Sequence, residues 1–267
     1  MSKVYFLKTD ESSYDKVSDS EKLFELFSDK FDSQDDLAIK LHFGERNNET
    51  YLNPEIVKSI YELIDKKVND CALVDCNVLY KSERSFGTSH KELAKANGFG
   101  FAPIIIADGE EGDDETNIEV NKKHFEKVKI GSGLDKFGSL LAITHFTGHG
   151  ANGIGGALKN VGMGLGSKGG KLEMHEAFNL EVNREECKRC GKCARICSAD
   201  CIEIEDEGAR IDREKCIGCG KCIAICPENA IKIPWGDSSS EKLQERIVEY
   251  AYGVLKDRKS YRSEERR

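Results

Sequence analysis

The segments CKRCGKCARIC (residues 187–197) and CIGCGKCIAICP (residues 216–227) carry eight cysteines in two copies of one spacing. Each copy reads Cys-x2-Cys-x2-Cys-x3-Cys. In iron–sulfur runs of this kind, three closely spaced thiolates hold one cluster and the fourth cysteine ligates the other cluster. The spacing therefore predicts two [4Fe–4S] clusters that exchange their fourth ligands. The first is expected on Cys187, Cys190, Cys193 and Cys226, and the second on Cys216, Cys219, Cys222 and Cys197.

Zinc is the alternative metal, because it also binds thiolates. A structural zinc site needs four ligands, commonly two Cys-x2-Cys pairs. Zinc binding therefore does not explain why the third and fourth cysteines of the run are repeated in the second copy. The duplication extends to a Cys-Gly-Lys-Cys sequence in each copy and to alternating apolar triplets at residues 202–204 and 231–233. Residues 181–234 thus resemble a two-cluster bacterial ferredoxin with duplicated βαβ units. Ser198 stands where the second copy has Pro227, which predicts a looser turn there.

Composition narrows the class of protein. The 267 residues suffice for one large domain and the small cysteine-rich domain. No apolar run approaches the ~20 residues of a membrane span, and the first residues show no signal-peptide pattern. A net charge of -8 and the lack of a basic stripe argue against a nucleic-acid partner. Because eight of the 11 cysteines are assigned to clusters, we expect a reducing, cytoplasmic location.

Residues 1–146 alternate between short apolar segments and amphipathic ones. This alternation predicts an α/β fold, with a mostly parallel sheet covered by helices on both faces, to which the cysteine segment adds a small α+β ferredoxin-like two-cluster domain. Residues 108–136 are expected to form either a hairpin or an excursion. Strands are predicted at residues 4–8, 37–43, 71–75, 103–107 and 140–146, and helices after the capping box Ser18–Glu21, from Asn53 and Pro54, and over residues 90–97.

The chain is expected to divide into three parts. Residues 1–180 form the α/β domain with a glycine-rich loop at 148–170, and residues 181–235 form the dicluster ferredoxin domain. Residues 236–267 form a C-terminal helix and a charged tail. An apolar stripe between Leu243 and Leu255 predicts that the helix packs on a neighbour. The last residues, 258–267, are strongly charged and are predicted to be disordered.

Polar residues recur where the predicted strands end, and ligands of open α/β sheets gather at the carboxyl ends of strands. Ten of the 25 glycines lie between residues 148 and 170, interspersed with lysines. We expect turns whose exposed N–H groups bind an anionic or metal-bound ligand beside basic side chains. The candidate catalytic residues are His42, Asp75, His145, His149, Lys159 and Lys168, with Asn160 in the same predicted pocket.

Two nucleotide-binding motifs are excluded in this stretch. Residues 148–153 spell Gly-x-Gly-x-x-Gly, but Gly155, Gly156 and Gly162 interrupt the helix that a dinucleotide fold requires. A Walker A loop is absent, because Gly170 and Lys171 are followed by leucine and not by serine or threonine. The other interpretation of the glycines is that they only let the backbone pass close to the clusters.

Four further segments resemble one family along nearly the whole chain. They are AIKLHFGE (38–45), NVLYK (77–81), PIIIADG (103–109) and GIGGALKNVGMG (153–164). They are similar to the uncharacterised iron–sulfur centre proteins of the domain of unknown function numbered 362, whose members carry an inserted dicluster ferredoxin. Members of that family usually continue past the ferredoxin with further strands. The resemblance implies the cofactor and the fold but no reaction.

Two functions from different classes follow from these patterns. In the first, two [4Fe–4S] clusters relay electrons to the α/β domain, which acts as an oxidoreductase on a small anionic substrate. In the alternative, the chain is an electron carrier or docking module for a redox partner protein and has no chemistry of its own. Residues 181–234 contain ten Lys or Arg and eleven Asp or Glu, so this segment is nearly neutral. Near-neutrality favours an internal relay over a freely diffusing acidic carrier.

Overall fold

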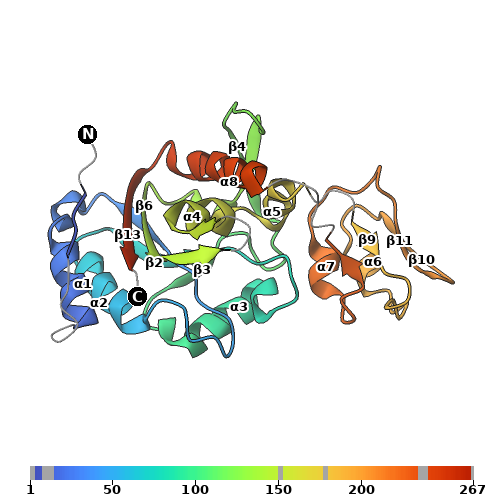
Figure 1. Cartoon of the computed structure of the whole chain (residues 1–267), viewed down its shortest axis with the longest axis horizontal. Helices are drawn as coiled ribbons and strands as arrows, with labels where there is room; N and C mark the ends of the chain where they lie inside the picture. Colours follow the sequence, from blue (N-terminus) through green and yellow to red (C-terminus); the bar gives the residue numbers. More distant parts are fainter. Residues whose placement is uncertain (1–3, 8–14, 150–152, 177–179, 234–239, 266–267) are drawn as a thin grey trace.

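The computed structural model describes residues 4–7, 15–149, 153–176, 180–233 and 240–265 (Figure 1). The central sheet of its α/β part contains five strands, β1 (Asp36–Lys40), β2 (Asp70–Asp75), β3 (Ile104–Ile106), β6 (Ser139–His145) and β13 (Lys259–Glu265). They form one sheet in the order β13-β6-β1-β2-β3, and every neighbouring pair is parallel. The prediction of an α/β fold with a mostly parallel sheet is confirmed.

Helices cover both faces of this sheet (Figure 1). The alternation of side chains along β1 separates two cores, with Leu37 and Ile39 in one and Ala38 in the other. Helices α1 (Lys16–Glu25) and α2 (Pro54–Asp65) pack on the first core, whereas α4 (Ala157–Leu165) and α8 (Ser240–Leu255) pack on the second. No helix within the described ranges is long and apolar enough to cross a membrane.

Local chemistry explains two of these helices. Asn53 caps α2, because its side chain accepts a hydrogen bond from the Glu55 backbone N–H, and Pro54 occupies the first turn as predicted. In α8, the predicted apolar stripe is confirmed, since Ile247, Tyr250 and Val254 are buried in the second core. The remaining helices of this part are α3 (Gly87–Ala94), α5 (Lys168–Met174), the short 3-10 turns Ser28–Lys30, Glu83–Ser85 and Ser132–Leu134, and a π turn Lys95–Phe99.

Several local predictions differ from the structure. Residues 4–7 form no strand, and residue 8 lies outside the described residues. Residues 259–265, predicted to be disordered, form β13 at the edge of the sheet, because their backbone pairs with β6 and this pairing does not depend on apolar side chains. The stretch 108–136 contains an antiparallel hairpin, which was one of the two alternatives. Its strands are β4 (Glu115–Glu119) and β5 (Lys127–Gly131).

The glycine-rich stretch is largely helical, although it was predicted to be a loop. After the small hairpin of β7 (Thr147–His149) and β8 (Gly153–Gly155), helices α4 and α5 occupy most of it. Its glycines permit close packing: a Cβ at Gly162 would lie 2.2 Å from the Ile247 carbonyl oxygen, and one at Gly170 would lie 2.6 Å from the Lys129 carbonyl oxygen. Glycine density here therefore reflects helix contacts more than ligand-binding turns.

The cysteine-rich segment forms a separate small module at one end of the molecule (Figure 1). After each Cys-x2-Cys pair the chain turns through a glycine with positive φ, Gly191 at 71° and Gly220 at 74°. A short helix then follows in each copy, and the two helices lie against each other. The module comprises β9 (Glu181–Val182), α6 (Lys192–Ile196), β10 (Ile202–Glu205), β11 (Gly208–Ile211), α7 (Lys221–Ile225) and β12 (Ile231–Lys232).

Apolar and ionic contacts join the module to the α/β part. Leu79 and Leu172 belong to the same buried cluster as the module residues Cys222 and Ile223. The Lys221 ammonium pairs with the carboxylates of Glu111 and Asp113, each at 2.6 Å. The Lys221 side chain is almost fully buried, whereas those of Glu111 and Asp113 remain partly exposed.

The substitution Gly162→Ala tests the contact between α4 and α8. The added methyl would meet the Ile247 carbonyl, so the helices must separate, and we expect a loss of about 1–3 kcal/mol of stability. Thermal unfolding should show a lower Tm, by about 2–4 °C per kcal/mol. Gly138→Ala is the control, because no atom lies within 4 Å of the added Cβ. An unchanged Tm for Gly162→Ala would contradict the described packing.

Candidate functional site

The cysteines of the module line two cavities. The first takes three cysteines from the second run and one from the first, and the second takes the complementary set. This exchange arises because α6 and α7 lie against each other, so the last cysteine of each helix reaches the other run. The first cavity holds Cys216, Cys219, Cys222 and Cys197, and the second holds Cys187, Cys190, Cys193 and Cys226.

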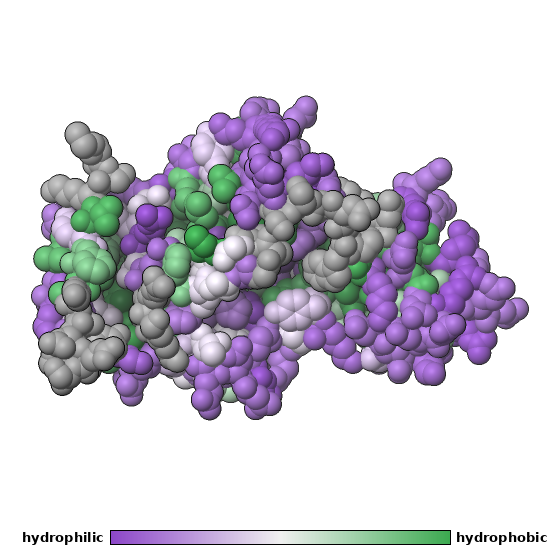
Figure 2. Space-filling model, in the orientation of Figure 1, coloured by the Kyte–Doolittle hydropathy of each residue, from purple (hydrophilic) through white to green (hydrophobic). Residues whose placement is uncertain are grey.

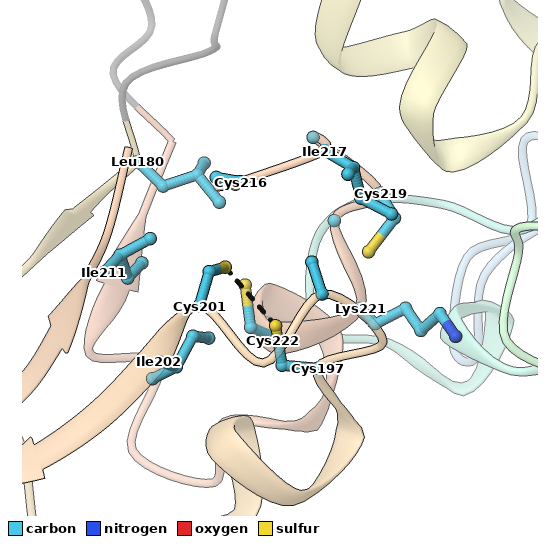
Figure 3. Close-up of a pocket in the computed structure, with 13 residues that line it drawn as sticks. Leu180, Cys197, Cys201, Ile202, Ile211, Cys216, Ile217, Cys219, Lys221 and Cys222 are labelled. Carbon is cyan, nitrogen blue, oxygen red and sulfur yellow. Dashed lines mark hydrogen bonds between the residues drawn. The ribbon is translucent and has the colours of Figure 1, made fainter. Parts of the chain in front are cut away.

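Apolar side chains form much of both walls, and charged residues, among them Lys188, Lys192 and Glu228, also line the second cavity. Leu180, Ile202 and Ile211 line the first cavity, and Val182 and Ile231 line the second. In Figure 3 the sulfur of Cys219 faces those of Cys197 and Cys222 across the first cavity, whereas the Lys221 side chain points away from it. The donors that reach these cavities are therefore soft sulfur atoms in an apolar setting.

Cys201 is a fifth cysteine in the wall of the first cavity. Its Sγ lies 3.4 Å from Cys197 Sγ, within hydrogen-bonding distance, and its side chain is buried (Figure 3). It lies outside both repeated runs, so the spacing gave no reason to place it at the cavity. A buried thiol beside a ligand thiolate can donate a weak hydrogen bond to it.

A buried charged network occupies the carboxyl edge of the sheet. The Asp75 carboxylate ends β2 and pairs with Lys40 Nζ at 3.0 Å and with Arg84 Nη2 at 2.8 Å. All three side chains are 4% exposed or less. Burial by itself would raise the pKa of Asp75, but the Lys40 and Arg84 cations outweigh it and hold the pKa below its ordinary value.

Arg84 connects Asp75 to three further polar groups. Its Nε donates to His90 Nε2 at 3.1 Å, and its Nη1 lies 2.8 Å from His42 Nε2 and 3.0 Å from a Glu45 oxygen. Burial lowers the pKa of His90 to about 3, and the nearby Arg84 cation adds to this effect against the opposing influence of Asp75. His90 is thus neutral and serves as a hydrogen-bond acceptor for the guanidinium.

His42 and Lys159 form the accessible side of this network. The His42 ring remains open to solvent, yet the protein around it disfavours the cation and, with Arg84, lowers its pKa to about 3. Burial and the Arg84 charge also lower the pKa of Lys159. Within the described residues, the half-buried Lys159 ammonium has no hydrogen-bond or ion-pair partner. A positive group without a counterion beside Arg84 favours an anionic ligand.

Two more histidines lie in the electrostatic reach of Lys159. Burial and then the Lys159 charge lower the pKa of His149, and the same two causes, with smaller ones, lower that of His175 to about 4. His149 is at the end of β7, and His175 follows α5. The charge of Lys159 thus acts on both histidines and is itself affected by Arg84, while the half-buried His145 ends β6.

Asn160 and Lys168 have different roles from their neighbours in the predicted pocket. Asn160 Oδ1 accepts from Lys40 Nζ at 2.7 Å, and its Nδ2 donates to Thr144 Oγ1, so it supports the buried lysine. Lys168 is fully buried and donates to the carbonyl oxygens of Ser85 and Glu111, at 2.6 and 2.8 Å. Burial lowers the pKa of Lys168 to about 8. Lys168 therefore lies beneath the module and not in a shared pocket with Lys159.

Three central residues of the network were not among the predicted catalytic candidates. Lys40, Arg84 and His90 are buried; Lys40 contacts Asn160 far along the chain, whereas Arg84 and His90 contact each other. One signal was present for Lys40, which is a charged residue inside an otherwise apolar strand. Such a residue is rarely buried without a partner. No comparable signal marks His90, which looks like any helical surface histidine.

The neutral state of His90 predicts a pH dependence of stability. In the unfolded chain its pKa is near 6.5, so between pH 6.5 and about 3 the unfolded state binds more protons, and stability falls as the pH drops. The slope is at most about 1.4 kcal/mol per pH unit. We expect Tm to fall between pH 7 and 5 more steeply in the wild type than in His90→Gln, which keeps an acceptor for Arg84. Parallel curves would contradict this assignment.

Comparison with protein families places these features in context. A family model described as Domain of unknown function (DUF362) matches residues 37–261, from β1 into β13. The matched region includes both cysteine cavities and the charged network around Asp75. No curated protein matches the chain. Since the match covers most of its length, the chain belongs to the DUF362 family.

Proposed function

We propose that the module holds two [4Fe–4S] clusters and that electrons pass through it to a reductive site at the carboxyl edge of the sheet. The observation that carries this proposal is the sorting of the eight run cysteines into two cavities with exchanged fourth members. Such an exchange is the ligand pattern of two-cluster ferredoxins. It joins residues from separate runs, which independent Cys-x2-Cys zinc sites would not require.

The donor set fits this cofactor. A cubane cluster binds one thiolate at each of its four irons, so its cysteines stand around a volume and do not converge on one point. In the described part of the chain, no three His, Cys, Asp or Glu side chains are grouped as ligands of a single metal ion. Apolar residues such as Leu180 and Ile202 reduce the access of water to the first cavity. When bound, such clusters accept and donate single electrons.

A short series of neighbouring groups links the first cavity to the sheet edge. A Cβ at Gly220, between Cys219 and Cys222, would lie 3.5 Å from Lys168 Cβ. Lys168 Nζ then donates to the Ser85 carbonyl oxygen, and Arg84, which precedes Ser85, contacts His42. The path runs from the turn at Gly220 along the Lys168 side chain, and then through one peptide unit and two short polar contacts. This path favours the internal relay over the alternative in which the α/β part only docks a partner protein.

The basic groups at the sheet edge favour reduction of a small anion. An anion that receives one electron gains one negative charge, which a fixed cation stabilises in a partly dehydrated site. Lys159 is the group best placed for this role, because it has no partner among the described residues and lies in the field of Arg84. Asp75, which also pairs with Lys40, holds Arg84 in position. The electrons come from an external one-electron donor.

The exchange of cysteines is testable with paired substitutions. The wild type should contain about eight iron and eight sulfide per chain. Cys197→Ser with Cys216→Ser affects only the first cavity. It should leave about four irons, because the second cavity keeps all four of its cysteines. Cys193→Ser with Cys197→Ser lies within one run but affects both cavities, and should lose both clusters. Cys201→Ser is the control and should retain eight irons. Four irons remaining in the same-run variant, or zinc in place of iron, would refute the assignment.

The role of Lys159 is tested by reoxidation. The anaerobic protein is reduced with dithionite, freed of excess reductant and mixed with nitrite or sulfite while the cluster absorbance is followed. We expect Lys159→Ala to slow reoxidation by a reactive anion at least tenfold and Lys159→Arg, which keeps the charge, to slow it less. Reoxidation by redox proteins alone, with equal rates in both variants, would instead support the carrier function.

A further inference from the structure

The two cavities of the module face different surroundings. Among the eight cysteines of the two runs, all within the described residues, Cys190 is the one that is exposed. The loop around Cys219 instead lies against the α/β part, since a Cβ at Gly220 would be 3.2 Å from the side chains of Leu79 and Leu172. The cavity of Cys190 therefore faces outward, and that of Cys219 faces inward.

Four basic residues surround the outward cysteine. Lys188, Arg189, Lys192 and Arg195, which we call the basic rim, are all exposed. No carboxylate in the described ranges forms an ion pair with any of them. Two of them instead hold the backbone near Cys190, as Arg189 donates to the Asp206 carbonyl oxygen and Arg195 to that of Cys190. The rim is thus a local positive surface on a chain whose net charge is -8.

The internal duplication shows that this charge is not a requirement of the cysteine run. In the second copy, the positions equivalent to Lys188, Arg189 and Arg195 are Ile217, Gly218 and Ala224. The fourth equivalent, Lys221, is buried and neutralised by Glu111 and Asp113. Free positive charge therefore occurs only on the copy whose cysteine reaches the surface.

A hollow adjoins the rim. It is lined by Lys192, Arg195, Ser198 and Lys221, with the Glu111 carboxylate and Cys197 of the inward cavity also in its wall. Figure 2 shows mostly hydrophilic residues over this end of the molecule. A surface that is polar, concave and positive beside a cysteine suits a transient partner whose charge is opposite.

We propose that the basic rim and the adjoining hollow dock an acidic one-electron carrier protein that supplies electrons at Cys190. The inference rests on the proposed function, because it requires a redox group in the outward cavity. Charge complementarity selects the partner: four unpaired cations attract an acidic surface, while the negative charge of the rest of the chain repels it and orients the encounter. The carrier loses one electron and this chain gains one, with no bond made or broken and no proton moved.

The test uses the full holoprotein and a reduced acidic flavodoxin as the probe. Stopped-flow absorbance gives the second-order rate constant for electron transfer, and calorimetry with the oxidised partner gives Kd. Lys192→Glu with Arg195→Glu should lower the rate constant at least tenfold at low salt and raise Kd by a similar factor. The wild-type rate should fall as salt is added, because salt screens the attraction.

The matched control is Lys58→Glu with Lys66→Glu, which changes the net charge equally on α2, at the opposite end of the molecule (Figure 1). It should leave the rate constant and Kd within twofold of the wild type. Iron content and reduction by dithionite should be equal in all three proteins. Equal flavodoxin rates and Kd in the rim variant, with normal iron and dithionite reduction, would overturn the docking proposal alone. A wild type that binds no iron would overturn the proposed function as well.

Discussion

The Asp75 carboxylate, held between Lys40 and Arg84, organises the carboxyl edge of the sheet. Removing it would leave two buried cations without a counterion, and breaking such a buried pair typically costs about 3–5 kcal/mol. Its influence extends outward, because Arg84 orients His42 and His90 while Lys40 orients Asn160. The basic site near Lys159 is therefore supported by a preorganised layer of buried charge, as electrostatic stabilisation of an anion requires.

The module is connected to this edge by the segment that contains Lys168. One end of this lysine lies under the turn at Gly220, and its ammonium holds the Ser85 carbonyl next to Arg84. The same short segment thus contacts both the inward cysteine cavity and the backbone of the charged network. If electrons enter at Cys190 and leave near Cys219, the route crosses the module from its exposed end to its buried end. In this proposal, the different exposure of the two cavities sets the direction of electron flow through the module.

The sequence predicted features that depend on local chemistry. Apolar runs located most strands of the sheet, the Asn53 cap located α2, and the stripe on α8 predicted its packing. It failed where distant partners decide the structure. Residues 259–265 are polar and become a strand only because β6 offers its backbone edge. Gly162 looked like part of a turn, but the approach of Ile247 from α8 explains it. The charge of Lys40 inside an apolar strand was a signal that it has a buried partner, but only the structure identifies Asp75 and Asn160 as those partners.

The central claim is that the chain binds two iron–sulfur clusters, each held by three cysteines of one run and one cysteine of the other. One cluster faces outward and the other faces the α/β part. Anomalous diffraction at the iron absorption edge, from crystals of anaerobically purified protein, tests it most directly. We predict two iron sites, one enclosed by Cys197, Cys216, Cys219 and Cys222 and the other by Cys187, Cys190, Cys193 and Cys226. Iron sites enclosed by the four cysteines of a single run, or an anomalous signal at the zinc edge in their place, would contradict it.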